Sequence, residues 1–286
     1  MTYSIFFALL SLAAAGCLDV TFRRFSLKER SRGMYVFGCG FVWLVLQLTY
    51  LTITDTQIRL DEVTILYGLL TGAFLVLANI FLIESLTGLD VSLGSMIYRL
   101  NTIGVVAISF MLLAEDIGFF KLLGIGIGVA AVLILYRRSD GGDTVPIPVL
   151  FFVMAVAASA FRAIYGVVSK VALEKGAAAE GLLVIAATSW IVGGFAYAAF
   201  REKRVRITGK KAAYAVVSGA LAFAVVNALI EALKNGEASV VVPIANLSFA
   251  VAMLLSVFLG MEQLSSRKYI AIGCAALSVF LMAQTA

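Results

Sequence analysis

The sequence predicts an all-α polytopic membrane protein with ten transmembrane helices, arranged as two inverted five-helix repeats. Its composition, the length of its apolar segments and an internal match between its halves support this fold class. Of the 286 residues, 62% are hydrophobic and 14% are charged, whereas a soluble domain is about half apolar and about a quarter charged. The apolar segments are continuous and show no strand-like alternation, so they indicate helices rather than a barrel.

Ten apolar segments approach the roughly 20 residues that a helix needs to cross a bilayer. The longest loop between them contains an Asp-Gly-Gly sequence and two prolines, which break helices. We interpret residues 139–147 as a linker that joins a first repeat, residues 1–138, to a second repeat, residues 148–286. The predicted spans are residues 3–22, 33–52, 64–85, 91–113, 119–136, 148–169, 181–200, 212–233, 240–260 and 269–282.

The first apolar segment also has features of a signal peptide, because small residues precede Cys17. Basic residues follow this segment at Arg23 and Arg24 and do not precede it. This is the reverse of the polarity of a signal peptide. We therefore interpret the segment as the first membrane helix.

The two halves match each other when the chain is shifted by about 147 residues. The segment GAFLVLANIFLIESL then aligns with GALAFAVVNALIEAL, and the register continues without a gap to the C-terminus. Because each half has five helices, an odd number, the second half must enter the membrane from the opposite side, as in many secondary transporters. The matched glycine, polar and charged positions include Gly72 with Gly219, Glu84 with Glu231, Ser92 with Ser239, Glu115 with Glu262, Lys121 with Lys268, and Gly126 with Gly273.

The basic residues of the chain gather in loops that flank the membrane. The segments RRFSLKERSR, after the first span, and REKRVRITGKK, after the seventh, are rich in Lys and Arg. Such loops explain the net charge of +5 better than nucleic-acid binding does. Cytoplasmic loops carry an excess of Lys and Arg, so we expect the odd-numbered loops to be cytoplasmic. In a cell (inner) membrane, both termini would then face the outside.

Two arginines lie deep in the predicted spans, where a charge needs a partner, water or a ligand. Arg99 is in the fourth span beside Tyr98 and Asn101, and Arg162 is in the sixth with Tyr165 on the same helical face. Transporters bind their substrates near the membrane midplane, so other polar and aromatic residues at that depth are also candidates for substrate binding. These are Trp43 and Gln47 in the second span, Trp190 in the seventh, Asn227 in the eighth and Asn246 in the ninth.

Three acids are candidates for coupling transport to protons. Glu84 and Glu231 lie within a turn of their helix ends, so capping a helix or tying a turn is the simpler interpretation. Asp19 lies closer to the hydrocarbon. It pairs either with Arg23, one turn away, or with one of the two deep arginines.

The deep arginines outnumber their plausible deep acid partner, which favours a substrate with an anionic group. The planar fork of an arginine suits a carboxylate or a phosphate. In the alternative interpretation, both arginines bond helix ends and backbone carbonyls in a wet cavity. The chain has no histidine, and its three cysteines lie in apolar segments, so we expect no metal ion, disulfide or other cofactor. The absence of a Walker motif excludes ATP as the direct driver.

The fifth span contains three glycines at every second position, Gly124, Gly126 and Gly128. They do not form a nucleotide-binding loop, because no strand precedes them and they lie inside a membrane span. We expect them to let neighbouring helices pack closely.

The segments that close the two halves resemble the end of the EamA-like repeat. They read FMLLAEDIGFFKLLGIGIGVAAVLIL and VFLGMEQLSSRKYIAIGCAALSVFLM. In that family a helix ends in a small-residue turn with a glutamate, to which Glu115 and Glu262 correspond. A glycine-bearing helix follows, and Gly126 and Gly273 match its glycine. The chain is therefore similar to the ten-helix branch of the drug/metabolite transporter superfamily. The resemblance implies a central cavity lined by both repeats and cytoplasmic termini, opposite to the orientation that the loop charges predict.

We therefore expect a secondary active transporter, not an enzyme, that moves a small polar metabolite with an anionic group by alternating access. Its partners would be a small-molecule substrate, the lipid bilayer and either coupled protons or a counter-substrate, with the protein a monomer or a homodimer. An exporter of amphiphilic or cationic compounds is the alternative and would need an exposed acid in the cavity. An intramembrane lipid-processing enzyme is disfavoured, because the sequence lacks histidine and an acid pair at ligand spacing.

Overall fold

The computed structural model describes residues 2–26, 31–85, 97–116, 118–134, 149–259 and 266–284. Within these ranges the regular structure is helical and no residue is assigned to a strand, which confirms the predicted all-α class. The helices are α1 (Thr2–Ser26), α2 (Arg32–Ile53), α3 (Glu62–Ser85), α5 (Asn101–Leu113), α6 (Phe119–Ile134), α7 (Val149–Glu174), α8 (Ala179–Tyr197), η1 (Ala198–Glu202), α9 (Gly209–Asn235), α10 (Ala238–Asn246), α11 (Ser248–Phe258) and α12 (Ser266–Ala283).

The described helices coincide with the predicted apolar segments. The seventh segment runs from α8 into η1, a π-helical turn, and the ninth is divided at Leu247 into α10 and α11. The first part of the fourth segment, residues 91–96, lies outside the described residues. Within the described ranges, seven helical segments are long and apolar enough to cross a membrane, and shorter apolar helices accompany them at Ile97–Leu113, Phe119–Ala131 and Tyr269–Met282.

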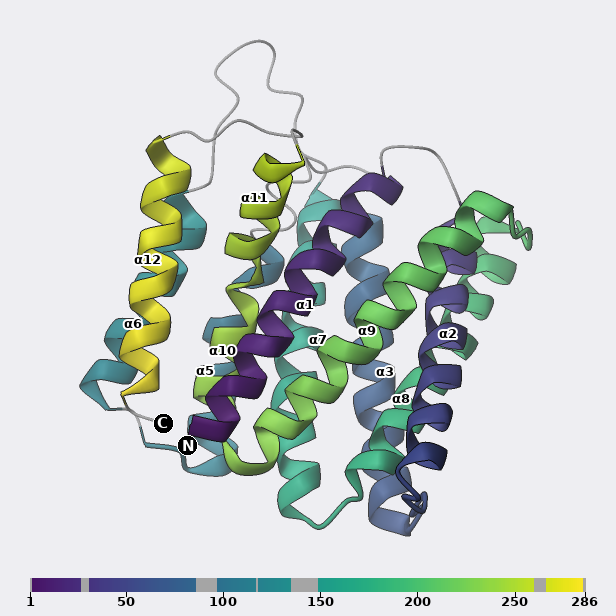
Figure 1. Ribbon diagram of the computed structural model, residues 1–286, viewed down its shortest axis with the longest axis horizontal. Coiled ribbons are helices and arrows are strands. Elements are labelled where there is room, and N and C mark those ends of the chain that lie inside the picture. Colours follow the sequence, from purple (N-terminus) through teal and green to yellow (C-terminus); the bar gives the residue numbers. More distant parts are fainter. Residues whose placement is uncertain are drawn as a thin grey trace.

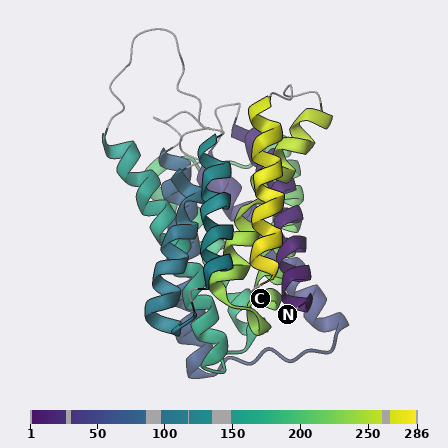
Figure 2. The same ribbon diagram turned by 90° about the vertical axis from the view of Figure 1, so that its left-hand side faces the viewer.

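The helices form one bundle with roughly parallel axes (Figures 1 and 2). In Figure 1, α6 and α12 form one edge of the bundle and α2 and α8 the other, with α1 and α9 crossing the face between them. The N- and C-termini lie at the same end of the bundle. We call this end the terminal end, and the end that carries the loop between η1 and α9 the basic end.

Helix contacts recur at the repeat offset. An added Cβ at Gly72 of α3 would lie 2.3 Å from the Ser189 Oγ of α8. At Gly219 of α9, the match of Gly72, an added Cβ would lie 2.6 Å from the Val42 Cβ of α2. Val42 and Ser189 are themselves matched, so the α3–α8 and α2–α9 contacts are equivalent. A second set of equivalent contacts joins Gly16 of α1 to Val251 of α11, and Ala163 of α7 to Gly104 of α5. Gly16 matches Ala163 at the repeat offset, and Val251 matches Gly104.

Side chains cap the helix N-termini at both ends of the bundle. The Glu202 carboxylate accepts hydrogen bonds from the Ser31 hydroxyl at 2.6 Å and the Arg32 backbone N–H at 2.7 Å, so η1 caps α2. The Asp61 carboxylate accepts a hydrogen bond from the Thr64 backbone N–H at 2.8 Å. That bond lowers the pKa of Asp61, because it favours the charged carboxylate.

The three glycines of α6 differ in their surroundings. Gly124 and Gly128 face α12, where an added Cβ would lie 2.8 Å from the Met282 Cγ and from the Ser278 Oγ, respectively. The Ser278 hydroxyl also donates a hydrogen bond to the Gly124 carbonyl at 2.6 Å. Among the described residues outside its own helical turn, no heavy atom lies within 4 Å of a Cβ placed at Gly126. In the described part of the chain, the prediction of close packing is therefore confirmed for Gly124 and Gly128 and wrong for Gly126. The reason is geometric, because positions four residues apart share a helix face and the residue between them does not.

We predict that Gly219→Ala destabilises the protein by about 1–3 kcal/mol, the usual cost of overpacking. The added methyl group would meet the Val42 Cβ and lie 2.7 Å from the Cys39 carbonyl oxygen, which is backbone and cannot rotate away. Gly126→Ala is the matched control, since the space there is open and alanine favours a helix by up to about 1 kcal/mol. Thermal unfolding of the purified variants in detergent measures both, and equal stability of the two would contradict the α2–α9 contact.

Candidate functional site

The candidate site is built around two helix breaks at matched positions. The chain leaves the helix at Leu100, before α5, and at Leu247, between α10 and α11. The backbone bonds at the two breaks are equivalent. Leu100 N–H donates to the Ile97 carbonyl at 3.2 Å, and Leu247 N–H donates to the Ile244 carbonyl at 3.0 Å, both in the tighter i to i−3 pattern. Paired interruptions in two halves of a membrane protein indicate a binding site between the halves.

Side chains from each break satisfy backbone groups at the breaks. The Asn101 side-chain amide donates to the Tyr98 carbonyl at 2.8 Å. The Arg99 guanidinium donates to the Asn246 carbonyl at 2.9 Å, across the interface between the halves. The Asn246 side-chain amide donates back to the Asn101 side chain at 2.5 Å and to the Thr102 hydroxyl at 3.1 Å. The two breaks therefore hold each other, and Arg99 bonds the backbone of its own repeat match.

Arg99 also forms an ion pair with Asp19 of α1. The same guanidinium donates to the Ser248 hydroxyl at 2.8 Å, and that hydroxyl lies 3.4 Å from the Asp19 carboxylate. The Asp19 side chain remains 37% exposed and that of Arg99 15%. Of the two partners predicted for Asp19, the structure thus shows a deep arginine. The side chain of Arg23 lies outside the described residues.

Arg162 of α7 lies near this cluster but is bonded differently. Its guanidinium carbon is 5.0 Å from the centre of the Tyr165 ring, as their spacing on one helix face predicted. Tyr98 interacts electrostatically with Arg162 and with both members of the Asp19–Arg99 pair, which places all four groups in one neighbourhood. Among the residues that the structure describes, no acid forms an ion pair with Arg162. The described neighbourhood therefore holds two cations and one anion.

The remaining candidate binding residues form a separate cluster between α2, α8 and α9. Trp43 and Trp190 meet edge to face with ring centroids 5.9 Å apart. Gln47 and Asn227 exchange side-chain hydrogen bonds at 3.3 and 2.8 Å. Both indole N–H groups are buried without a hydrogen-bond partner in the described part of the chain. The two tryptophans occupy matched positions, a signal that the repeat offset could have revealed from the sequence.

The two glutamates considered for proton coupling lie at helix ends. Glu84, near the end of α3, is 3.9 Å from the Arg201 guanidinium of η1. Glu231 of α9 pairs with Lys234 at 2.6 Å and accepts a hydrogen bond from the Tyr3 hydroxyl at 3.2 Å. Each has a cationic partner near a helix end, which fits the simpler interpretation that they tie the ends of the bundle.

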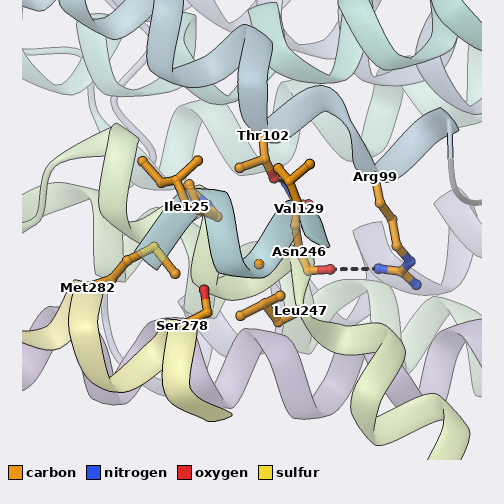
Figure 3. Close-up of a pocket in the computed structure, with 10 residues that line it drawn as sticks. Arg99, Thr102, Ile125, Val129, Asn246, Leu247, Ser278 and Met282 are labelled. Carbon is orange, nitrogen blue, oxygen red and sulfur yellow. Dashed lines mark hydrogen bonds between the residues drawn. The ribbon is translucent and has the colours of Figure 1, made fainter. Parts of the chain in front are cut away.

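A small cavity borders the break between α10 and α11. Figure 3 shows Thr102 of α5, Val129 of α6 and Ser278 of α12 converging on it, with Arg99 at its edge pointing to the Asn246 carbonyl. Its volume is about 10 Å³, room for about one water molecule. The two halves are therefore closed on each other at this cavity.

A polar cluster at the terminal end links the two halves. The Glu115 carboxylate accepts hydrogen bonds from the Ala238 and Ser239 backbone N–H groups, at 2.8 and 2.9 Å, and so caps α10. Lys121 is 2% exposed, pairs with Glu237 and donates to the Ser239 hydroxyl at 3.0 Å. The repeat singled out Glu115 and Lys121, but the sequence did not indicate that they bind the other half. The side chains of their matches, Glu262 and Lys268, lie outside the described part of the structure.

The fold and the site define a polytopic helical membrane protein with paired interrupted helices at the interface of two related halves. The sequence matches the EamA-like transporter family twice, over residues 2–137 and 150–284. The chain therefore belongs to the EamA-like transporter family, within the drug/metabolite transporter superfamily, as its half-ends indicated. Members of this family are membrane transporters, so the predicted class of function is confirmed.

Solved structures support the same fold. One crystal structure superposes with a TM-score of 0.84 and 15% sequence identity, over 100% of this chain and 99% of the other. In total, 29 solved chains match. No curated protein matches the sequence. At this level of identity the likeness concerns the fold alone.

We predict that Glu115→Ala lowers the free energy of unfolding by about 1–3 kcal/mol, because two buried N–H donors of α10 lose their acceptor. Glu174→Ala is the control, since Glu174 is a half-exposed carboxylate 3.6 Å from Lys170 on the same helix, and such pairs contribute about 0–1 kcal/mol. Thermal unfolding in detergent compares the two. A Glu115 variant as stable as the Glu174 variant would show that the cap does not hold the halves together.

Proposed function

We propose that the protein is a secondary active transporter that moves a small polar metabolite with an anionic group by alternating access. The observation that carries the proposal is Arg162, a cation in the middle of α7 without an acidic partner among the described residues. A charge at that position in a membrane-spanning helix needs compensation. Arg99 is already neutralised by Asp19, so one further negative charge balances the neighbourhood.

The nature of the anionic group follows from the donors around it. The guanidinium of Arg162 offers a planar fork that matches a carboxylate or a phosphate. The Tyr165 ring lies against this guanidinium, and Tyr98 lies within electrostatic range of it. Both tyrosines can donate a hydroxyl hydrogen bond to the same group. Asn101 and Asn246 bond each other at the helix breaks and would bind the polar remainder of the substrate when the halves separate.

The architecture that supports alternating access is an inverted repeat of ten helices, with residues 1–138 and 148–286 as the halves and residues 139–147 as the linker. The two family matches divide the chain near the same linker. The equivalent α3–α8 and α2–α9 contacts and the matched breaks support a two-fold relation between the halves. Rocking of two such halves around a fixed midplane site is how many secondary transporters expose it to each side in turn.

We further propose that the basic end faces the cytoplasm of a cell (inner) membrane. The exposed Lys203, Arg204, Arg206 and Lys210 lie at that end, in the loop that joins η1 to α9 and at the start of α9. Basic residues close to a membrane favour the cytoplasmic side. Both termini would then lie outside.

We predict that Arg162→Gln weakens binding of the anionic substrate by about 10- to 100-fold, because a hydrogen bond to a charged group contributes about 1.5–3 kcal/mol. A panel of organic anions, organic cations and neutral metabolites is tested by thermal shift on the purified protein, since a bound ligand stabilises the fold by mass action. Anions that stabilise the wild type are then assayed for uptake into proteoliposomes.

Arg201→Gln is the matched control, because it removes the same charge from a side chain that is 73% exposed. It should leave anion binding and uptake unchanged. Stabilisation by cations or neutral compounds alone, with an Arg162 variant that responds like the wild type, would contradict the proposal. That result would favour an exporter of cationic compounds, with the half-exposed Asp19 as its acid.

A further inference from the structure

Three charged residues of the candidate site have no counterpart in the other half. At the repeat offset Asp19 falls on Gly166, Arg99 on Asn246 and Arg162 on Ala15. Contacts that build the bundle recur in both halves, as the equivalent helix contacts and the two breaks do. Each of the three charges is therefore present in one half only, Asp19 and Arg99 in the first and Arg162 in the second, and is an addition to a scaffold whose helix contacts recur in both.

The position of Asp19 is that of a ligand rather than of a packing residue. One carboxylate oxygen receives both the Arg99 guanidinium and the Ser248 hydroxyl. These two donors lie at the two helix breaks, whereas Asp19 projects from α1, outside the breaks. Its side chain is 37% exposed and lies near the end of the membrane span Tyr3–Phe22, so the carboxylate is close to the membrane surface. The Asp19 carboxylate can therefore separate from the Arg99 guanidinium without becoming an unpaired charge buried in the protein interior.

We propose that Asp19 is a resident substitute for the substrate, an internal carboxylate that occupies Arg99 until the anionic group of the substrate displaces it. This inference rests on the proposed anion transport and specifies the substrate further, as a compound whose carboxylate or phosphate oxygens can bind Arg99 in place of Asp19. The pair neutralises Arg99 whenever no substrate is bound to it, so the two halves can close on each other without burying an unpaired charge. Competition by Asp19 weakens binding, because only the fraction of protein with a free Arg99 binds substrate.

The first test uses Asp19→Asn, which keeps the size of the side chain and removes the competing charge. The anion identified by the thermal-shift panel should bind this variant about tenfold or more tightly than the wild type. Asp19→Glu, which keeps a carboxylate, should bind it like the wild type. Unchanged or weaker binding by Asp19→Asn would overturn the proposal, because a residue that only supports the site would lower affinity when it is replaced.

The second test does not need the substrate and uses formate, acetate and inorganic phosphate as probes on Asp19→Ala. If the carboxylate position of Asp19 is a true anion site, millimolar formate or acetate should raise the unfolding temperature of this variant by several degrees. The wild type and the double variant Asp19→Ala/Arg99→Gln should show no such shift. The proposal would be overturned if Asp19→Ala unfolds cooperatively but none of the three anions raises its unfolding temperature. It would also be overturned if the anions raise the unfolding temperature of the double variant by the same amount.

The two proposals fail in different ways. If Arg162→Gln transports the anion normally while formate still stabilises Asp19→Ala, the substitute role of Asp19 stands and the assignment of Arg162 falls. If Arg162→Gln loses anion binding while Asp19→Asn binds no more tightly than the wild type, the transport proposal stands and the substitute role falls. Should Asp19→Ala not fold, the sign of the change in Asp19→Asn alone decides.

Discussion

In hydrocarbon, every backbone N–H and C=O must find its partner within the protein, because no water is present to replace a missing one. This constraint governs the centre of the structure, where the chain leaves the helix at Leu100 and at Leu247. Each break keeps an i to i−3 backbone hydrogen bond. Arg99 bonds the Asn246 carbonyl at the second break, Asn101 bonds the Tyr98 carbonyl at the first, and the Asn246 and Asn101 side chains bond each other between them. The breaks therefore require each other, and the polar groups that satisfy them give an otherwise apolar bundle its only described deep cluster of charge.

The features that occur in both halves belong to the scaffold, whereas the charged residues of the candidate site occur in one half only. The repeated features are close helix contacts at glycines, the breaks and the Trp43–Trp190 pair, whose members match each other. The terminal end is held by Glu115 and Lys121 across the halves, through the cap of α10 and the pair with Glu237. The Asp19 carboxylate, which is partly exposed, already pairs with Arg99, and the cavity beside the pair is only about 10 Å³. In the proposed transport cycle, this pair would let the halves close without burying an unpaired arginine.

The all-helical class and the two repeats could be predicted from the sequence because the relevant signals are strong and local. Apolar length defines the helices, and the repeat depends on residues such as Gly72 and Gly219 that touch equivalent neighbours. The pairing of Asp19 with a deep arginine was one of two options, since sequence spacing cannot choose between Arg23 on the same helix and Arg99 on another. The break at Leu247 was not predicted, because Pro243 within α10 removes the hydrogen bond to the Ser239 carbonyl, on its N-terminal side, and does not mark a break four residues further on. The exchange between Gln47 and Asn227 joins α2 to α9 and depends on packing that no local pattern reports.

The most direct test is an experimental structure of the protein with the stabilising anion bound. We expect density for the anion within hydrogen-bond distance of both Arg162 and Arg99, with the Asp19 carboxylate moved away from Arg99 and the Asn101–Asn246 contact opened. Density for the anion elsewhere, with the Asp19–Arg99 pair intact and Arg162 bonded to groups of the protein, would contradict it and would assign both arginines to the scaffold.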